Sequence, residues 1–251
     1  MFNVKEIEIK IPYKEGNLYG VLFMPETVEK AACFICSHGI YSSYQMTSLS
    51  AKEIAAFGFP AVCFDFRGCS YSNKSGGKCE DASVLSEEEE LEAVVEWMRV
   101  QPFCDSEKLY LLGQSLGGFV SALAGAEKQN KIAGMLLMYP AFNSKQTVEY
   151  MFPDNDKIPD VIPDFMNLPG LNIGRRFISD AKSAPLDEAI ASFKKPVYLI
   201  HGTADRLVPV ETGQRAAEAY GGKFVIAEGA EHGFNLTHEQ AKDALEYFDL
   251  I

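Results

Sequence analysis

The chain has 251 residues, of which 47% are hydrophobic and 23% charged, so it is long enough for one domain with a sizeable core. Acidic residues outnumber basic ones by 35 to 23, and the formal net charge of −12 argues against nucleic acid and anionic membrane surfaces as partners. No apolar run approaches a membrane span and the first residues show no signal-peptide pattern, so we expect a cytoplasmic protein.

The first elements are two loosely alternating runs, residues 4–11 and 18–24, which predict an antiparallel hairpin closed by Pro25. From residue 31 onward the pattern changes to short, continuous apolar runs separated by helical stretches. These runs are residues 31–36, 60–64, 109–112, 132–138, 196–200 and 223–227. Continuous apolar strands that alternate with helices predict an α/β fold, in which a mostly parallel sheet is covered on both faces.

The helices between these runs have recognisable ends. Residues 46–57 end at a glycine, and residues 211–220 and 236–249 form the last two helices. Ser86 is positioned to cap a helix that runs to about Val100, with Glu89 completing a capping box. We expect the acidic run 87–90 to be a solvated helix N-terminus that the helix dipole favours.

The six cysteines lie largely in or beside predicted strands and lack the paired spacing of zinc knuckles. Cys33 and Cys36 fall in one apolar strand, where they would point to opposite faces. We therefore expect free thiols in a reducing compartment. The two glycosylation sequons, at Asn73 and Asn235, would then stay unmodified.

Residues 140–185 interrupt the alternation of strands and helices. The segment has no clean strand but contains several prolines and a group of large apolar side chains, namely Tyr150, Met151, Phe152, Phe165 and Met166. Long irregular segments in compact domains usually serve as lids or binding elements. We expect a cap inserted after the sixth strand, between the core segments 1–139 and 186–251, with Phe152 and Phe165 as candidate substrate-binding residues.

The strongest motif is the stretch from Gly113 to Gly117, with Ser115 at its centre. A strand precedes it and helical spacing follows it, which predicts the G-x-S-x-G turn that lifts a serine oxygen clear of a sheet. A dinucleotide fingerprint would need glycine in place of the serine, and a phosphate loop would need lysine followed by Ser or Thr after Gly118. The sequence fits neither of these alternatives.

A nucleophilic serine needs a base, and the base needs an acid that fixes its tautomer. Four histidines are present: His38, His201, His232 and His238. His232 follows the last predicted strand, whereas His38 and His201 are interpreted as turn-stabilising residues and His238 as a surface residue. Ser115, Asp205 and His232 each fall just past the carboxyl end of a strand, where sites form in open parallel sheets.

Asp65 is the rival acid, but it precedes the serine in the chain and is interpreted as a residue that holds its own loop. The backbone N–H groups of Ile40 and Leu116 are the candidate oxyanion-hole donors. Leu116 directly follows the serine at the helix N-terminus, and Ile40 follows the sharp His38-Gly39 turn after the first parallel strand. No metal is implied, since the H-E-x-x-H motif and its variants are absent, and no cofactor is expected.

The chain resembles the α/β-hydrolase superfamily. The resemblance rests on the His38-Gly39 turn, residues 65–70, the serine turn 113–118, residues 201–209 and residues 229–233. Within the superfamily, the chain length and the short cap are similar to bacterial cinnamoyl (feruloyl) esterases and monoacylglycerol-lipase-like enzymes. The resemblance implies an eight-stranded sheet, a Ser115–His232–Asp205 triad and ester hydrolysis through an acyl-enzyme.

The sequence departs from the cinnamoyl esterases at Gln114 and Leu116, where those enzymes usually carry His and Gln. Polar cap residues bind the aromatic hydroxyl in those esterases, and Tyr150, Asp154, Asp160 and Asp164 are of the right type, although no spacing selects among them. Arg175 and Arg176 are interpreted as surface ion-pair partners.

The leading functional hypothesis is a carboxylesterase for small aryl or short-chain acyl esters. The alternatives are a monoacylglycerol lipase, a serine aminopeptidase or C–C hydrolase on the same triad, and a binding protein that keeps the fold. The expected partner is a small-molecule ester, and a homodimer is left open.

Overall fold

A mixed eight-stranded sheet runs through the computed structural model, which describes residues 1–68 and 70–251. The strands lie in the order β1-β2-β4-β3-β5-β6-β9-β10. Their bounds are β1 Val4–Tyr13, β2 Gly16–Pro25, β3 Ala31–Ser37, β4 Ala61–Phe64, β5 Cys104–Gln114, β6 Gly134–Met138, β9 Val197–Gly202 and β10 Lys223–Ala227. The pairs β1–β2 and β2–β4 are antiparallel and the other pairs are parallel, which confirms the predicted hairpin and the mostly parallel sheet.

The central strands are continuously apolar because the sheet is covered on both faces. In β3, Cys33 and Ile35 pack into one core cluster, whereas Phe34 and Cys36 pack into the other. The period of two residues along a strand produces this alternation. Cys33 and Cys36 therefore point to opposite faces, as predicted.

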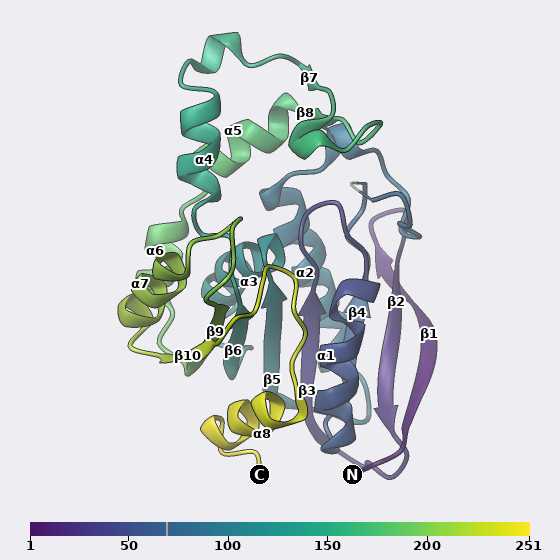
Figure 1. The fold of residues 1–251 in the computed structure, drawn as a ribbon. Helices are drawn as coiled ribbons and strands as arrows, with labels where there is room; N and C mark the ends of the chain where they lie inside the picture. Colours follow the sequence, from purple (N-terminus) through teal and green to yellow (C-terminus); the bar gives the residue numbers. More distant parts are fainter. Residues whose placement is uncertain (69) are drawn as a thin grey trace.

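Helices cover both faces of the sheet. Figure 1 shows α1 and α8 in front of the sheet and α2 and α3 behind it, and the two core clusters divide in the same way. The helix bounds are α1 Gln45–Ala56, α2 Val84–Arg99, α3 Leu116–Glu127, α4 Ser144–Met151, α5 Arg175–Ser183, α6 Leu186–Ser192, α7 Val210–Tyr220 and α8 His238–Tyr247.

The start of α2 differs from the prediction. Ser83, not Ser86, is the N-cap, and it forms a capping box with Ser86, in which the hydroxyl of each serine accepts from the backbone N–H of the other. Glu89 makes no cap and instead pairs with Lys14 at 2.9 Å. Ser83 is fully buried in an extended conformation, so tertiary packing sets the first turn three residues earlier than Ser86.

The acidic run on α2 is also less solvated than predicted. Glu87 and Glu90 are only 5% and 4% exposed, because they fall on the face of α2 that packs against the core. Burial raises the pKa of both carboxyls, that of Glu90 to about 7. One oxygen of Glu90 accepts a hydrogen bond from the backbone N–H of Arg67 at 2.9 Å.

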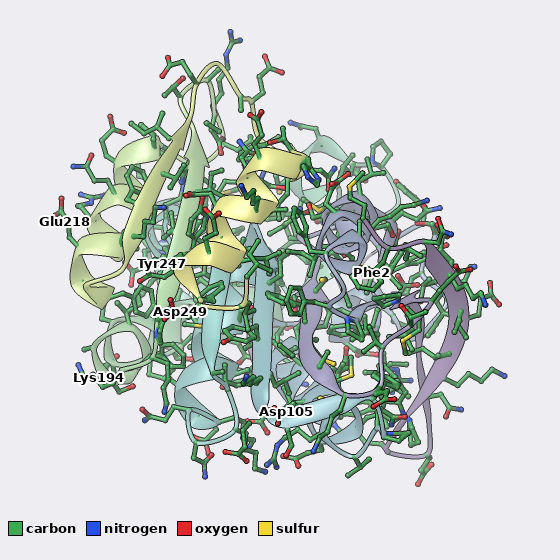
Figure 2. All side chains as sticks on the ribbon, turned by 90° about the horizontal axis from the view of Figure 1, so that it is seen from below. Phe2, Asp105, Lys194, Glu218, Tyr247 and Asp249 are labelled. Carbon is green, nitrogen blue, oxygen red and sulfur yellow. The ribbon has the colours of Figure 1, made fainter. Side chains whose placement is uncertain are left out.

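Residues 140–185 lie beyond the carboxyl ends of the parallel strands, at the top of Figure 1. They form α4, α5, the short antiparallel pair β7 Val161–Ile162 and β8 Ile173–Gly174, and 3-10 turns at Asn155–Lys157 and Phe165–Asn167. A further 3-10 turn, Cys79–Asp81, precedes α2. Both chain termini lie at the opposite end of the molecule. Figure 2 shows this lower side, where Phe2, Lys194 and Tyr247 are labelled.

Four cysteines, Cys33, Cys36, Cys63 and Cys104, are free and buried, as expected. Cys79 is disulfide-bonded, so the expectation of free thiols is wrong at that residue. Cys69 lies outside the described residues. Within the described parts of the chain, no helix is both long enough and apolar enough to cross a membrane.

Candidate active site

Ser115 occupies a strained turn between β5 and α3. Its backbone has φ 55° and ψ −122°, a conformation that residues other than glycine rarely adopt. The turn depends on close backbone approaches at both glycines. A Cβ at Gly113 would lie 2.6 Å from the carbonyl oxygen of Gly117, and a Cβ at Gly117 would lie 2.2 Å from that of Ser37. The two glycines of the motif are therefore required by these close contacts, while the unusual backbone conformation is that of Ser115.

The structure brings Ser115, His232 and Asp205 together in one hydrogen-bonded chain. The serine Oγ lies 2.9 Å from Nε2 of the histidine, and Nδ1 of the histidine lies 2.8 Å from Oδ2 of the aspartate. A carboxylate can only accept, so Nδ1 carries the ring proton and Nε2 is free to accept from the serine. This arrangement can take a proton from Ser115 while stabilising the imidazolium that forms.

The Asp205 side chain is fully buried (0% exposed), and backbone donors fix its orientation. Its Oδ1 accepts from the N–H groups of Leu207 and Val208, each at 2.9 Å, within the turn that follows β9. Oδ2 is thereby directed at His232. The acid is preorganised by its own loop.

The loop that carries His232 is attached to the core at three points. Tyr139 packs its ring edge-on to the imidazole, with centroids 4.8 Å apart, and donates its hydroxyl hydrogen to the carbonyl of Phe234 at 2.8 Å. Further along, Ser50 accepts from the backbone N–H of Leu236 at 3.0 Å. Burial raises the pKa of Tyr139, which therefore stays a neutral donor.

Gln114, one of the two positions that depart from the cinnamoyl esterases, is the third attachment point. It is fully buried, and its amide nitrogen donates to Ser50 Oγ at 3.1 Å and lies 3.4 Å from Oδ1 of Asn235. Ser50 in turn lies 3.0 Å from the same oxygen of Asn235. The residue before the serine thus helps to hold the loop that supplies the base.

Two backbone N–H groups beside the serine have no acceptor among residues 1–68 and 70–251. They belong to Ile40 and Leu116, the predicted oxyanion donors, and both residues line the cavity at Ser115. The N–H of Gly39 is directed elsewhere, to the sulfur of Met46 at 3.3 Å. A Cβ at Gly39 would lie 3.0 Å from Cβ of Ser115 and 3.3 Å from its Oγ, so a side chain here would press directly on the serine.

Ser115 and His232 open into a cavity of about 620 Å³, large enough for a small organic ligand. Apolar side chains dominate the walls, and many of them come from residues 140–185. The lining residues outside the turns already described are Ala141, Asn143, Ser144, Thr147, Val148, Met151, Ile162, Pro163, Asp164, Phe165, Met166, Asn167, Phe177, Leu207 and Val208. One face of α4 contributes Ser144, Thr147, Val148 and Met151, at helical spacing.

Of the residues predicted to bind substrate from this segment, some line the cavity and others do not. Phe165 lines this cavity, whereas Phe152 is not among the lining residues and packs against the core beside it. Asp164 lines the cavity, and its Oδ1 accepts from the N–H of Gly170 at 2.9 Å. Tyr150 is 88% exposed and does not line the cavity.

The other polar residues of segment 140–185 form contacts within the segment. Asp160 pairs with Arg175 at 3.0 Å, and Arg176 pairs with Asp180 at 3.1 Å, as predicted for surface ion pairs. Asp154 caps the turn that follows it, accepting from the N–H of residue 156 at 3.1 Å.

The rival acid and the other histidines have separate roles. Asp65 accepts from the N–H groups of Tyr44 at 2.7 Å and Lys74 at 2.8 Å, so it holds loops together. His38 stabilises its turn through Nδ1, which lies 2.8 Å from the Gly39 carbonyl oxygen, and its Nε2 accepts from the N–H of Phe66 at 3.1 Å. His238 starts α8 at the surface and lies 3.2 Å from a Glu53 oxygen.

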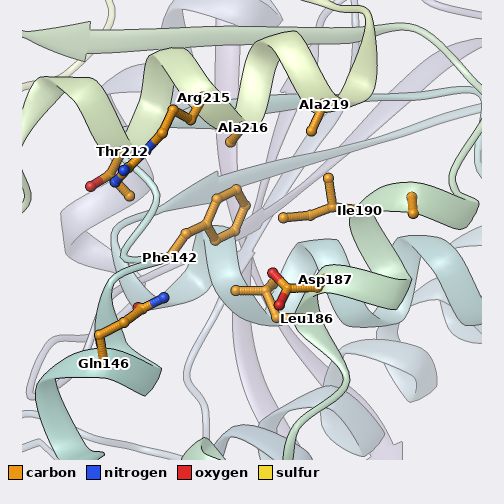
Figure 3. Close-up of a pocket in the computed structure, with 10 residues that line it drawn as sticks. Phe142, Gln146, Leu186, Asp187, Ile190, Thr212, Arg215, Ala216 and Ala219 are labelled. Carbon is orange, nitrogen blue, oxygen red and sulfur yellow. The ribbon is translucent and has the colours of Figure 1, made fainter.

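A second, smaller cavity of about 360 Å³ lies between the start of α4, α6 and α7 (Figure 3). Phe142, Ile190 and Ala216 give it apolar walls, and none of the triad residues lines it. Phe142 lines this cavity while its neighbours Ala141 and Asn143 line the larger one, so one stretch of backbone borders both.

No cluster of three or more His, Cys, Asp or Glu side chains suited to a metal ion occurs in the described part of the chain.

Comparisons with known proteins agree on the type of fold. The family model Hydrolase_4, described as serine aminopeptidase S33, matches residues 28–170. An uncharacterised protein of Mycobacterium tuberculosis is 26% identical over 229 residues, which cover 90% of this chain and 72% of that protein.

Two solved structures superpose over nearly the whole chain. Est1E from Butyrivibrio proteoclasticus with bound ferulic acid gives a TM-score of 0.85 at 23% identity, covering 96% of this chain and 98% of that one. The α/β-hydrolase GrgF from Penicillium sp. sh18 gives 0.79 at 17% identity, covering 98% of each chain. At these identities the likeness establishes the fold alone.

Proposed function

Because the chain belongs to the α/β-hydrolase family described as serine aminopeptidase S33, we propose that it is a serine hydrolase that cleaves carboxylic esters through an acyl-enzyme. The observation that carries the proposal is the hydrogen-bonded series from Asp205 through His232 to Ser115, which ends in a largely apolar cavity. Beside it lie two backbone N–H groups that have no acceptor in the described part of the chain. These contacts support Ser115 as nucleophile, His232 as base and Asp205 as acid, with the N–H groups of Ile40 and Leu116 as oxyanion donors.

In the acylation step, Oγ of Ser115 attacks the ester carbonyl carbon and Nε2 of His232 takes the hydroxyl proton. The N–H groups of Ile40 and Leu116 donate to the oxyanion that forms, and loss of one such donor typically costs about 3 kcal/mol of transition-state stabilisation. The tetrahedral intermediate then collapses, and the alcohol leaves with the proton from His232.

In the deacylation step, His232 takes a proton from water, and the hydroxide attacks the acyl carbonyl on Ser115. The same two N–H groups stabilise the second oxyanion. Collapse releases the carboxylic acid and returns the proton to the serine oxygen, so the enzyme is regenerated without a cofactor.

The cavity walls point to small aryl or short-chain acyl esters as substrates. Phe165, Phe177 and Met151 offer flat or adaptable apolar contact to an aromatic or acyl group. Among the lining residues one carboxylate is present, that of Asp164, so a cationic amino terminus would find one counter-charge. We propose that residues 140–185 act as the cap that closes this cavity from solvent.

The experiment is a panel of nitrophenyl esters from acetate to palmitate, together with methyl ferulate and aminoacyl nitroanilides. The wild type is compared with Ser115→Ala, which removes only the nucleophilic oxygen. The proposal expects hydrolysis of short-chain or ferulate esters that the variant lacks. A long-chain optimum would make the protein a lipase, cleavage of nitroanilides alone would make it a peptidase, and no cleavage of any substrate would refute the proposal.

A further inference from the structure

A second histidine lies against the acid of the triad. His201, in β9, is fully buried, and its Nε2 is 3.3 Å from Oδ2 of Asp205 and 3.0 Å from the carbonyl oxygen of Val208. Oδ2 is the same oxygen that His232 contacts at 2.8 Å. The carboxylate therefore lies between two imidazole rings, while its other oxygen accepts two backbone N–H groups.

The proton on His201 can be placed from its neighbours. A carbonyl and a carboxylate both accept and cannot donate, so Nε2 must carry the hydrogen. It donates this hydrogen to the Val208 carbonyl at 3.0 Å, with Oδ2 of Asp205 3.3 Å from the same nitrogen. Nδ1 has no hydrogen-bond partner in the described structure and packs on α7, where a Cβ at Gly213 would lie 2.4 Å away. Burial lowers the pKa of His201, which agrees with a neutral ring that donates only through Nε2.

We propose that His201 is a positioning residue that holds the Asp205 carboxylate in line with His232 and takes up part of its charge. This inference rests on the proposed function. Together with the N–H groups of Leu207 and Val208, His201 Nε2–H fixes the rotation of the carboxylate, so that Oδ2 stays on the axis of the His232 Nδ1–H bond. The imidazole ring of His201 fits here because Gly213 has no side chain.

Because His201 would take up part of the charge on Asp205, the direction of a pH effect can be predicted. Asp205 and His232 are the titratable groups whose charges act on His201. A donor on Oδ2 reduces the negative charge that His232 meets, so removing the donor strengthens the hold of Asp205 on the imidazolium. The acid limb of the reaction's pH profile therefore moves upward when the donor is removed.

The test measures the rate at which a fluorophosphonate modifies Ser115 between pH 5 and 9, about the range over which a histidine base titrates. In that step the serine oxygen bonds to phosphorus and fluoride leaves, so the readout reports the triad without needing the true substrate. His201→Leu removes the donor with little change in volume, whereas His201→Gln keeps an N–H near the position of Nε2. Tyr198→Phe is the matched control, because it removes a hydrogen bond to Asp243 from the same strand, away from the site.

We expect His201→Leu to slow labelling about tenfold and to move the acid limb up by about half a pH unit, while His201→Gln stays within about threefold of the wild type. Tyr198→Phe should label at the wild-type rate. Thermal unfolding of each variant checks its fold. If His201→Leu does not fold, the shorter amide of His201→Asn, which falls short of Asp205, serves as the arm without a donor.

Two results would overturn the inference alone: wild-type labelling in the variant without a donor, or equal slowing of the Leu and Gln variants with an unmoved acid limb. The second result would mean that His201 only fills space. Failure of the wild type itself to be labelled at Ser115 would refute the proposed function, and the inference with it.

Discussion

Asp205→Asn should inactivate the enzyme through the tautomer of His232, with little change in shape. Oδ1 of Asp205 accepts two backbone N–H groups at 2.9 Å, so the amide oxygen of an asparagine would take that place. Its NH₂ group would then face Nδ1 of His232 where Oδ2 now lies. Because NH₂ only donates, the histidine must present a bare Nδ1 and carry its proton on Nε2, where it can no longer accept from Ser115.

The alternative amide orientation costs more. It would place the NH₂ group against the backbone N–H groups of Leu207 and Val208, which would then have no acceptor. Each unsatisfied buried donor costs about 1–3 kcal/mol of stability. The preferred orientation leaves one conflict, with His201 Nε2 at 3.3 Å, and that donor still has the Val208 carbonyl at 3.0 Å. The wrong tautomer in another serine-hydrolase triad lowers kcat about 10⁴-fold, which corresponds to about 5 kcal/mol of transition-state stabilisation.

The assay compares wild type, Asp205→Asn and Asp205→Ala in fluorophosphonate labelling and in hydrolysis of a short nitrophenyl ester. Both variants should lose about 10³–10⁴-fold in rate, and the asparagine variant should be no more active than alanine although it restores the shape of the side chain. Thermal unfolding confirms that each variant is folded. An asparagine variant within tenfold of the wild type would refute the reasoning from the tautomer.

Three further predictions follow from close contacts, burial and capping. Gly39→Ala should lower kcat about tenfold or more, because the alanine Cβ would lie 3.3 Å from Ser115 Oγ. The measurement is kcat on the ester that the wild type hydrolyses fastest. An unchanged kcat would mean that the turn tolerates a side chain. Glu90 has a raised pKa of about 7, so between about pH 4.5 and 7 the native carboxyl keeps a proton that the unfolded one loses, and the free energy of unfolding falls as pH rises over that window. Glu90→Gln, which can still accept from the N–H of Arg67, should be more stable than wild type by about 2–3 kcal/mol in urea unfolding at pH 8 and equal to it near pH 4; no pH-dependent difference would contradict the assignment. Ser83→Ala removes the N-cap of α2 and should cost about 1 kcal/mol in the same urea assay, whereas an unchanged midpoint would mean that the cap contributes nothing.

Local signals account for what the sequence predicted well. The continuous apolar runs have to be strands of a covered parallel sheet, and the turn at Ser115 needs glycines on both sides. The spacing of Ser115, Asp205 and His232 past strand ends then places them at one edge of the sheet, where the structure brings them into hydrogen-bond contact. These inferences depend on neighbours in sequence or on the topology of the sheet.

The differences arise where tertiary packing overrides local pattern. The first turn of α2 starts at Ser83 because that serine is buried, and Glu87 faces the core although it lies in an acidic run. The cavity face of α4 has helical spacing at Thr147, Val148 and Met151 that could have been recognised within the predicted cap. The contact between His201 and Asp205 could not, because it depends on the ring orientation that Gly213 permits.

The most direct test of the central claim is to identify the acyl-enzyme. The wild type is mixed with a nitrophenyl ester, quenched within one turnover and analysed by peptide mass spectrometry, with Ser115→Ala treated in the same way. The account predicts an acyl group on the peptide that contains Ser115 and none on the variant. An acyl group on another residue, or ester turnover that persists in Ser115→Ala, would contradict it.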